Sequence, residues 1–168
     1  VWASLWNFEA YEARLRNYVS QTDVYMAVLV QVGINMDRGG VMITRDPFDP
    51  DKKVIYISVV CGHNSLIPDN KGVPEQIIYD PKTDSVSLIT VSEQKSALTF
   101  SERGDLREIP DTCADANGRI LSDAQVRKLS SIALKIQQIF GDEKPQDIEW
   151  GIMRGRVYIV QSRPYIEK

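Results

Sequence analysis

The sequence predicts an α+β fold with a mostly antiparallel sheet and two main helices. Several β-prone runs are joined by short turn-forming segments, which is typical of antiparallel strands. Two stretches instead space their apolar residues as a helix does. An apolar share of 43% and a charged share of 26% are those of a soluble globular protein. With 168 residues, the chain is long enough to bury one core.

The first helix is predicted directly after Asn7, which is a suitable N-cap. Phe8, Tyr11, Leu15 and Tyr18 follow at steps of three, four and three, so they share one apolar face. We expect that face to pack against other parts of the protein.

The second helix is predicted between Ser122 and Gly141. Ser122 and Gln125 have the spacing of a capping box, and Gly141 is a natural stop. An apolar stripe connects these ends: Val126, Leu129, Ala133, Ile136 and Phe140. We expect this helix to pack on the sheet and to support the final hairpin.

The β-prone runs predict the strands. The run 25–31 is continuous enough for a buried strand. Further strands are expected at 39–47 and 53–60, and 75–91 predicts a hairpin with its turn at 81–84. The stretch 92–118 contains several breakers and predicts loops with weak strands.

Composition narrows the possible partners. A net charge of −3 and a pI near 5.2 argue against nucleic-acid and acidic-membrane partners. The sequence contains no apolar run of membrane-spanning length and no signal peptide, so we expect a cytoplasmic protein. Cys61 and Cys113 have no metal-site spacing and are expected to be reduced thiols. His63, the single histidine, is expected to be a surface residue.

The C-terminal stretch predicts a hairpin with polar side chains gathered on one face. Asp147 and Glu149 share a face of the first strand, and Gln161 and Arg163 share a face of the second. A three-residue loop at 154–156 would place Glu149 opposite Gln161 and Asp147 opposite Arg163. The other face would hold the core residues Ile148, Trp150, Tyr158 and Val160.

These polar residues suit a magnesium nucleotide. A carboxylate such as Glu149 beside an amide oxygen such as that of Gln161 is a pair of hard oxygen ligands for Mg²⁺. Arg163 adds a planar cationic fork for phosphate oxygens. The alternative is an amphipathic edge hairpin with an Asp147–Arg163 ion pair and a solvated Glu149.

The segments 147–150 and 158–164 closely resemble the end of the ATP-binding domain of phosphoenolpyruvate synthases (pyruvate, water dikinases). Pyruvate, phosphate dikinases, rifampicin phosphotransferases and glucan, water dikinases are similar. The resemblance implies an ATP-grasp fold in which Glu149 and Gln161 hold Mg²⁺ and Arg163 meets the phosphates of ATP as a catalytic residue. Asp147 belongs to the same nucleotide-binding set.

Earlier segments resemble the same family. By position, Gln31, Val32 and Gly33 correspond to the stretch that meets the adenine edge, although Gly33 replaces a larger apolar residue. A plain turn between two core strands is the alternative there. The family's Gly-Leu-Gly-Glu loop becomes Gly62-His63-Asn64-Ser65, so it loses a carboxylate.

The resemblance covers residues 1–168 and implies a fragment of a longer polypeptide, as does the start at Val1. The first ATP-grasp lobe, the phosphohistidine domain and the pyruvate-binding barrel would lie outside it. The implied partners are ATP and that phosphohistidine domain. The resemblance also allows the full-length enzyme to be a homodimer. The implied reaction converts ATP, pyruvate and water to phosphoenolpyruvate, AMP and phosphate, and the fragment alone would be inactive. A rifampicin- or glucan-type acceptor and a non-catalytic nucleotide-sensing module are the alternatives.

Overall fold

The computed structural model describes residues 1–63, 73–110 and 113–166. The chain divides into two compact units, Val1–Gly33 and Ile34–Lys168. Each unit is described by itself.

The first unit is helical. It contains a 3₁₀ helix, η1 (Trp2–Trp6), followed by α1 (Phe8–Arg16). The predicted N-cap is confirmed, because the Asn7 side chain accepts a hydrogen bond of 2.9 Å from the backbone N–H of Ala10. The Arg14 guanidinium is the buried polar group of this unit and lies 5.4 Å from the centre of the Trp6 ring.

The apolar face predicted for the first helix exists, but the described residues do not cover it. Its four members are all exposed: Phe8, Tyr11, Leu15 and Tyr18. The predicted packing is therefore not made within this unit. A 33-residue segment with one short helix has too little surface to bury such a face.

The strand predicted at 25–31 is wrong for this structure. Residues 24–36 form neither helix nor strand, and Tyr25, Leu29 and Val30 are exposed. A strand needs a neighbour to satisfy its N–H and C=O groups. Neither sheet of the described residues includes this run.

The second unit holds the sheet. Its elements are β1 (Arg38–Ile43), β2 (Ile55–Cys61), β3 (Glu75–Asp80), β4 (Ser85–Thr90), β5 (Ser96–Phe100), β6 (Leu106–Pro110), α2 (Asp123–Phe140), β7 (Gln146–Met153) and β8 (Arg156–Pro164). The main sheet has the order β4-β3-β2-β1-β7-β8, with antiparallel neighbours throughout. β5 and β6 form a separate antiparallel pair. The predicted α+β class and the predicted elements from residue 39 onward are confirmed.

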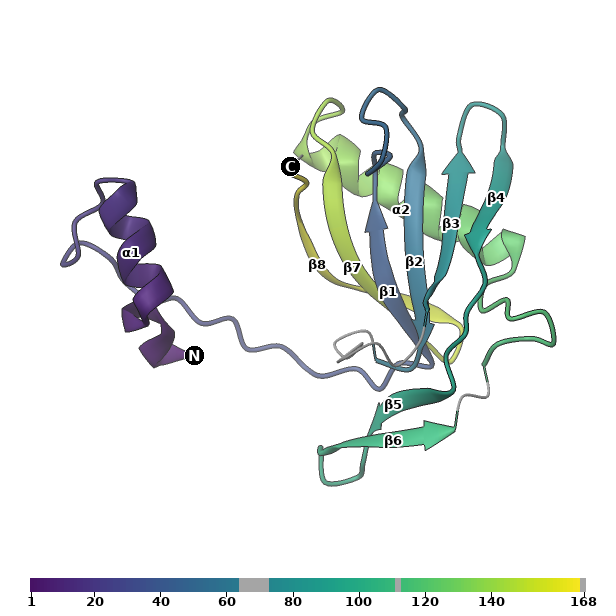
Figure 1. Cartoon of the computed structure of the whole chain (residues 1–168), viewed down its shortest axis with the longest axis horizontal. Coiled ribbons are helices and arrows are strands. Elements are labelled where there is room, and N and C mark those ends of the chain that lie inside the picture. The colour runs from purple at the N-terminus through teal and green to yellow at the C-terminus, as the bar shows by residue number, and fades with distance from the viewer. Residues whose placement is uncertain (64–72, 111–112, 167–168) are drawn as a thin grey trace. The chain divides into compact units, whose positions relative to one another are not determined.

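The core lies between the main sheet and α2, which crosses behind the sheet in Figure 1. α2 begins at the predicted capping box, where the Ser122 side chain accepts from the Gln125 N–H and the Gln125 side chain accepts from the Ser122 N–H. It buries Val126, Leu129 and Ala133 of its apolar stripe against alternate residues of the strands, including Met42, Ile148 and Trp150. Ile136 is only partly buried, and Phe140, at the end of the helix, is exposed. The core occupies the α2 side of the sheet; on the opposite side Tyr56 and Val60 are also buried, while Asp147 and Glu149 are partly exposed.

The prediction of two reduced thiols is wrong. Cys61, at the end of β2, and Cys113, after β6, form a disulfide with a Cα–Cα distance of 5.9 Å. The two cysteines are 52 positions apart, and the chain between them returns to β2 through the β5–β6 pair. Nothing in their spacing indicated this contact.

A buried carboxylate fastens the start of β3 to the segment that leads into α2. Glu75 is fully buried and accepts hydrogen bonds from Arg119 Nε at 2.9 Å, from the Leu121 N–H at 3.1 Å and from the Ile120 N–H. These bonds satisfy backbone donors that would otherwise be buried without partners.

We expect Glu75→Ala to lower the free energy of unfolding by about 3 kcal/mol, because it leaves two buried backbone donors and the Arg119 Nε without their acceptor. Urea unfolding of the 168-residue chain measures this. Glu143→Ala is the matched control, because Glu143 and its partner Lys53 are both largely exposed and such pairs contribute about 0–1 kcal/mol. Equal effects of the two substitutions would contradict the anchoring role.

In the part of the chain that the structure describes, no helix has the length and apolar character needed to cross a bilayer.

Candidate functional site

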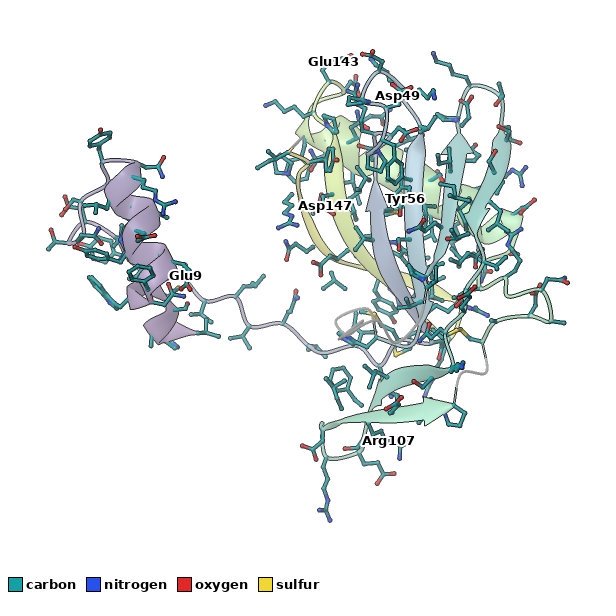
Figure 2. All side chains as sticks on the ribbon, viewed as in Figure 1. Glu9, Asp49, Tyr56, Arg107, Glu143 and Asp147 are labelled. Carbon is teal, nitrogen blue, oxygen red and sulfur yellow. A yellow bond between two sulfur atoms is a disulfide. The ribbon has the colours of Figure 1, made fainter. Side chains whose placement is uncertain are left out.

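The face of the main sheet opposite α2, which we call the open face, carries the predicted polar residues. Val41 of β1 pairs with Glu149 of β7, and Ile43 pairs with Asp147. Residues directly opposite each other in an antiparallel pair share a face, and Met42 between these two faces the core. Asp147 and Glu149 therefore lie on the open face, and Figure 2 labels Asp147 on β7.

The pairing of β7 with β8 brings the four predicted side chains together. Glu149 lies opposite Gln161, and Asp147 lies opposite Arg163, as the sequence predicts. All four side chains therefore share the open face.

The predicted loop, however, is wrong. Met153 pairs with Arg156, so the turn contains only Arg154 and Gly155, with φ of 51° and 75°. This is the left-handed backbone of a two-residue hairpin turn. The Arg154 N–H donates to the Asp37 carboxylate at 2.6 Å. This bond helps Arg154, which is not a glycine, to adopt the left-handed backbone conformation.

A β-bulge restores the register that the shorter turn would lose. Glu149 pairs with Gln161 but Trp150 pairs with Ile159, so Val160 is an extra residue without a partner on β7. Without that bulge, a two-residue turn would place Val160 opposite Glu149 and would turn Gln161 toward α2. The shorter turn and the bulge therefore have opposite effects on the register, and together they keep Glu149 opposite Gln161.

The same bulge changes the predicted core. Ile148 and Trp150 are fully buried as expected. Tyr158 is not a core residue on the α2 side, because it pairs with Gly151, which shares the open face with Glu149. Its ring lies 5.4 Å from the Arg156 guanidinium. Val160, also predicted as core, is the unpaired bulge residue.

Arg163 is held in place by Asp147. Its Nε and Nη2 atoms donate to the same carboxylate oxygen of Asp147, at 2.9 and 2.8 Å. These bonds and the opposite charges raise the pKa of Arg163 above its usual value, so the guanidinium stays cationic. The Asp147–Arg163 ion pair, which the alternative of a simple amphipathic hairpin also predicts, is thus present. It also orients Arg163, whose side chain is 65% exposed, for contact with an anion.

Glu149 and Gln161 provide oxygen atoms suited to a hard cation. Among the described residues, no group of three or more His, Cys, Asp or Glu side chains is placed to hold a metal ion. The pair could therefore supply only part of a coordination shell. Mg²⁺ commonly binds through one or two protein oxygens and completes its shell with phosphates and water. The donor atoms thus fit a magnesium ion that arrives with a nucleotide.

His63 is not the isolated surface residue that the sequence suggested. Its ring packs edge-to-face on Phe100 with the centroids 5.1 Å apart. Burial lowers the pKa of His63, while the negative charge of Glu149 opposes this to a smaller extent. Sequence reasoning missed this because Phe100 lies in a weak strand far along the chain. Asn64 and Ser65, the altered positions that follow, lie outside the described residues.

The predicted adenine-edge residues, Gln31, Val32 and Gly33, are exposed and end the first unit. They are not part of the second unit, which carries the other predicted site residues. Their role with adenine stays a prediction.

The site geometry makes Asp147 a positioning residue for Arg163. We expect Asp147→Asn to raise about tenfold the ATP concentration needed for half-maximal autophosphorylation, the activity that the family resemblance implies for the full-length protein, because it weakens both bonds that orient the guanidinium. The rate at saturating ATP should change less. Steady-state rates at varied ATP test this, with the Asp84→Asn variant, which weakens a surface pair with Arg127, as the control.

Comparisons with known proteins agree with the resemblance. The family model described as "Pyruvate phosphate dikinase, AMP/ATP-binding domain" matches residues 1–168. A probable phosphoenolpyruvate synthase of Archaeoglobus fulgidus is 35% identical over 164 residues, which are 97% of this chain and 21% of the relative. The phosphoenolpyruvate synthase of Pyrococcus furiosus is 26% identical, with 97% and 21% covered. The rifampicin phosphotransferase of Bacillus subtilis is 28% identical, with 97% and 18% covered. The chain thus spans about a fifth of the length of these curated relatives.

Proposed function

Because the chain belongs to the pyruvate phosphate dikinase AMP/ATP-binding domain family, we propose that it is the C-terminal part of the ATP-grasp domain of a phosphoenolpyruvate synthase-like dikinase. The full-length enzyme would transfer a phosphoryl group from ATP to a histidine of a separate domain and then to pyruvate. Water would take up the other phosphate, and phosphoenolpyruvate, AMP and phosphate would be the products.

The observation that carries this proposal is the pairing of Glu149 with Gln161 and of Asp147 with Arg163 on the open face. Phosphoryl transfer depends mainly on positioning and on the stabilisation of negative charge. Arg163, cationic and oriented by Asp147, would contact the oxygens of the transferring group. Glu149 and Gln161 would hold Mg²⁺, which neutralises charge between the phosphates when bound.

The first ATP-grasp lobe, which would lie outside these 168 residues, would complete the nucleotide site. Relatives about five times longer than this chain leave room for that lobe, for the phosphohistidine domain and for the pyruvate-binding barrel. The open face and the first unit's exposed apolar face are both suited to contact such parts. Residues 31–33 would meet the adenine edge. The 168-residue chain by itself would therefore not turn over ATP.

The acceptor is tested by measuring AMP release by the full-length protein with pyruvate, with rifampicin and without an acceptor. Pyruvate-dependent AMP and phosphoenolpyruvate support the proposal. Rifampicin-dependent AMP would replace it with the second candidate, which the similarity to a rifampicin phosphotransferase favours. ATP binding without AMP release under any condition would indicate a nucleotide-sensing module.

A further inference from the structure

The two halves of the Cys61–Cys113 disulfide differ in how easily another molecule can reach them. Cys61 is 1% exposed and belongs to the core, whereas Cys113 is only partly buried. Cys113 lines two cavities, of about 190 and about 320 Å³, compared with about 30 Å³ for one water molecule in the liquid. An incoming thiol can therefore reach the sulfur of Cys113 more readily than that of Cys61.

The disulfide helps to attach the β5–β6 pair, which Figure 1 shows at one end of the main sheet. Gln94, just before β5, accepts from the Cys61 N–H at 2.9 Å and donates to the Cys61 carbonyl oxygen at 3.0 Å. Gly62 forms a bridge with Leu98 of β5. The disulfide adds a covalent link from the other end of the pair, after β6. A cross-link between residues 52 positions apart removes much of the freedom that an opened pair would have.

Asp37 connects this region to the hairpin of the candidate site. Its carbonyl oxygen accepts from the N–H of Gly62, the residue after Cys61, at 2.9 Å. Its carboxylate accepts from the N–H of Arg154, in the turn between β7 and β8, at 2.6 Å. Its own N–H donates to the Ile152 carbonyl oxygen of β7 at 2.8 Å. The end of β2 and the β7–β8 turn therefore share one residue as their link.

The residues before Asp37 are held between the same two parts of the second unit. The Asn35 side-chain oxygen accepts from the Thr99 hydroxyl of β5 at 2.7 Å and from a backbone N–H of β5 at 3.1 Å. Met36 is 6% exposed and packs against Gly151 of β7, where an added Cβ would collide with its side chain. A movement of β5 would therefore also release the segment that leads into β1.

We propose that the Cys61–Cys113 disulfide is a thiol–disulfide exchange site whose reduction by a dithiol weakens nucleotide binding; the nucleotide part rests on the proposed function. A thiolate of the dithiol attacks the Cys113 sulfur, the S–S bond breaks, and Cys61 leaves as a thiolate that takes up a proton. The second thiolate of the reductant then attacks the mixed disulfide and releases Cys113. Two electrons pass to the protein, and the dithiol becomes a disulfide.

Reduction leaves the β5–β6 pair attached by hydrogen bonds and packing, so the pair opens more often. Each opening frees the Asn35 side chain and removes the contact of Gly62 with β5. Asp37 loses part of its support in this way, and the β7–β8 turn is held less firmly. The candidate site is then less preorganised, and a nucleotide that binds there has to order it first.

The test compares the oxidised full-length protein with the same protein treated with dithiothreitol. Alkylation followed by peptide mass spectrometry shows whether Cys61 and Cys113 have become thiols. Hydrogen exchange of residues 96–110 and the dissociation constant of ATP with Mg²⁺ are then measured. We expect reduction to speed up this exchange and to weaken ATP binding, each about tenfold, and reoxidation to restore both.

Cys113→Ser is the matched variant, because it cannot form the disulfide and replaces one sulfur by an oxygen. It should exchange and bind ATP like the reduced wild-type protein, with or without dithiothreitol. If this variant still responds to dithiothreitol, other cysteines of the full-length protein are responsible and the proposal is wrong. A disulfide that persists in dithiothreitol, or reduction without faster exchange at 96–110, would also overturn it. Global unfolding on reduction would do the same, because the disulfide would then be a purely structural cross-link.

The two readouts separate this inference from the proposed function. If the oxidised protein binds ATP with Mg²⁺ and reduction leaves that affinity unchanged, only the inference fails. If the oxidised protein does not bind ATP with Mg²⁺, the proposed function fails, and the exchange rates decide the redox response of the β5–β6 pair by themselves.

Discussion

Glu149→Ala is expected to slow ATP-dependent autophosphorylation of the full-length protein about a thousandfold. The substitution removes the carboxylate of the proposed metal pair, and the electrostatic contribution of a phosphate-bound metal ion amounts to several kcal/mol of transition-state stabilisation. Incorporation of radiolabelled γ- or β-phosphate measures the rate.

Two further variants make this result specific. Glu149→Gln keeps an oxygen ligand but loses the charge, so it should be intermediate. Glu143→Ala removes an exposed carboxylate that pairs with Lys53 and should retain nearly the wild-type rate. A near-wild-type rate for Glu149→Ala would refute the metal role of the β7–β8 pair.

Arg163→Ala is expected to reduce autophosphorylation by about 10³-fold, because arginine stabilises the charge that spreads over the phosphoryl oxygens in the transition state. Arg163→Lys should lose about a hundredfold, since a lysine keeps the charge but lacks the planar fork. Rates at saturating Mg²⁺ and ATP distinguish these losses from weaker binding.

The matched control for Arg163 is Arg127→Ala. Arg127 of α2 also pairs with an aspartate, Asp84 of the β3–β4 turn. This pair lies near β4, at the opposite edge of the main sheet from β8. If Arg127→Ala and Arg163→Ala slow the reaction equally, Arg163 has no special role with the phosphates. If Asp147→Asn slows the reaction further when Arg163 is already alanine, Asp147 acts on the nucleotide directly rather than only through Arg163.

Local patterns predicted much of the second unit. The capping box at Ser122, the stop at Gly141 and the hairpin at 75–91 depend on neighbouring residues, so the sequence shows them directly. The β7–β8 pairing was also predicted at the site. It was predicted for the wrong reason, because a three-residue loop was expected and a shorter turn with a bulge produces the same pairing.

Features that depend on distant residues were not predictable. The run 25–31 has strand propensity, but propensity does not create a strand without a partner. Cys61 and Cys113 meet only after the β5–β6 pair has folded back. The surroundings of His63 depend on that same return of the chain, through Phe100.

Val160 gives the β8 strand a further property. Deleting this residue would leave Glu149 opposite Gln161 and Asp147 opposite Arg163, now in an uninterrupted ladder. What would change is curvature, because an extra residue bends its strand and increases the local twist. The cross-strand partners of Gln161 and Arg163 therefore do not depend on Val160. The direction in which these two side chains project over the sheet does depend on it.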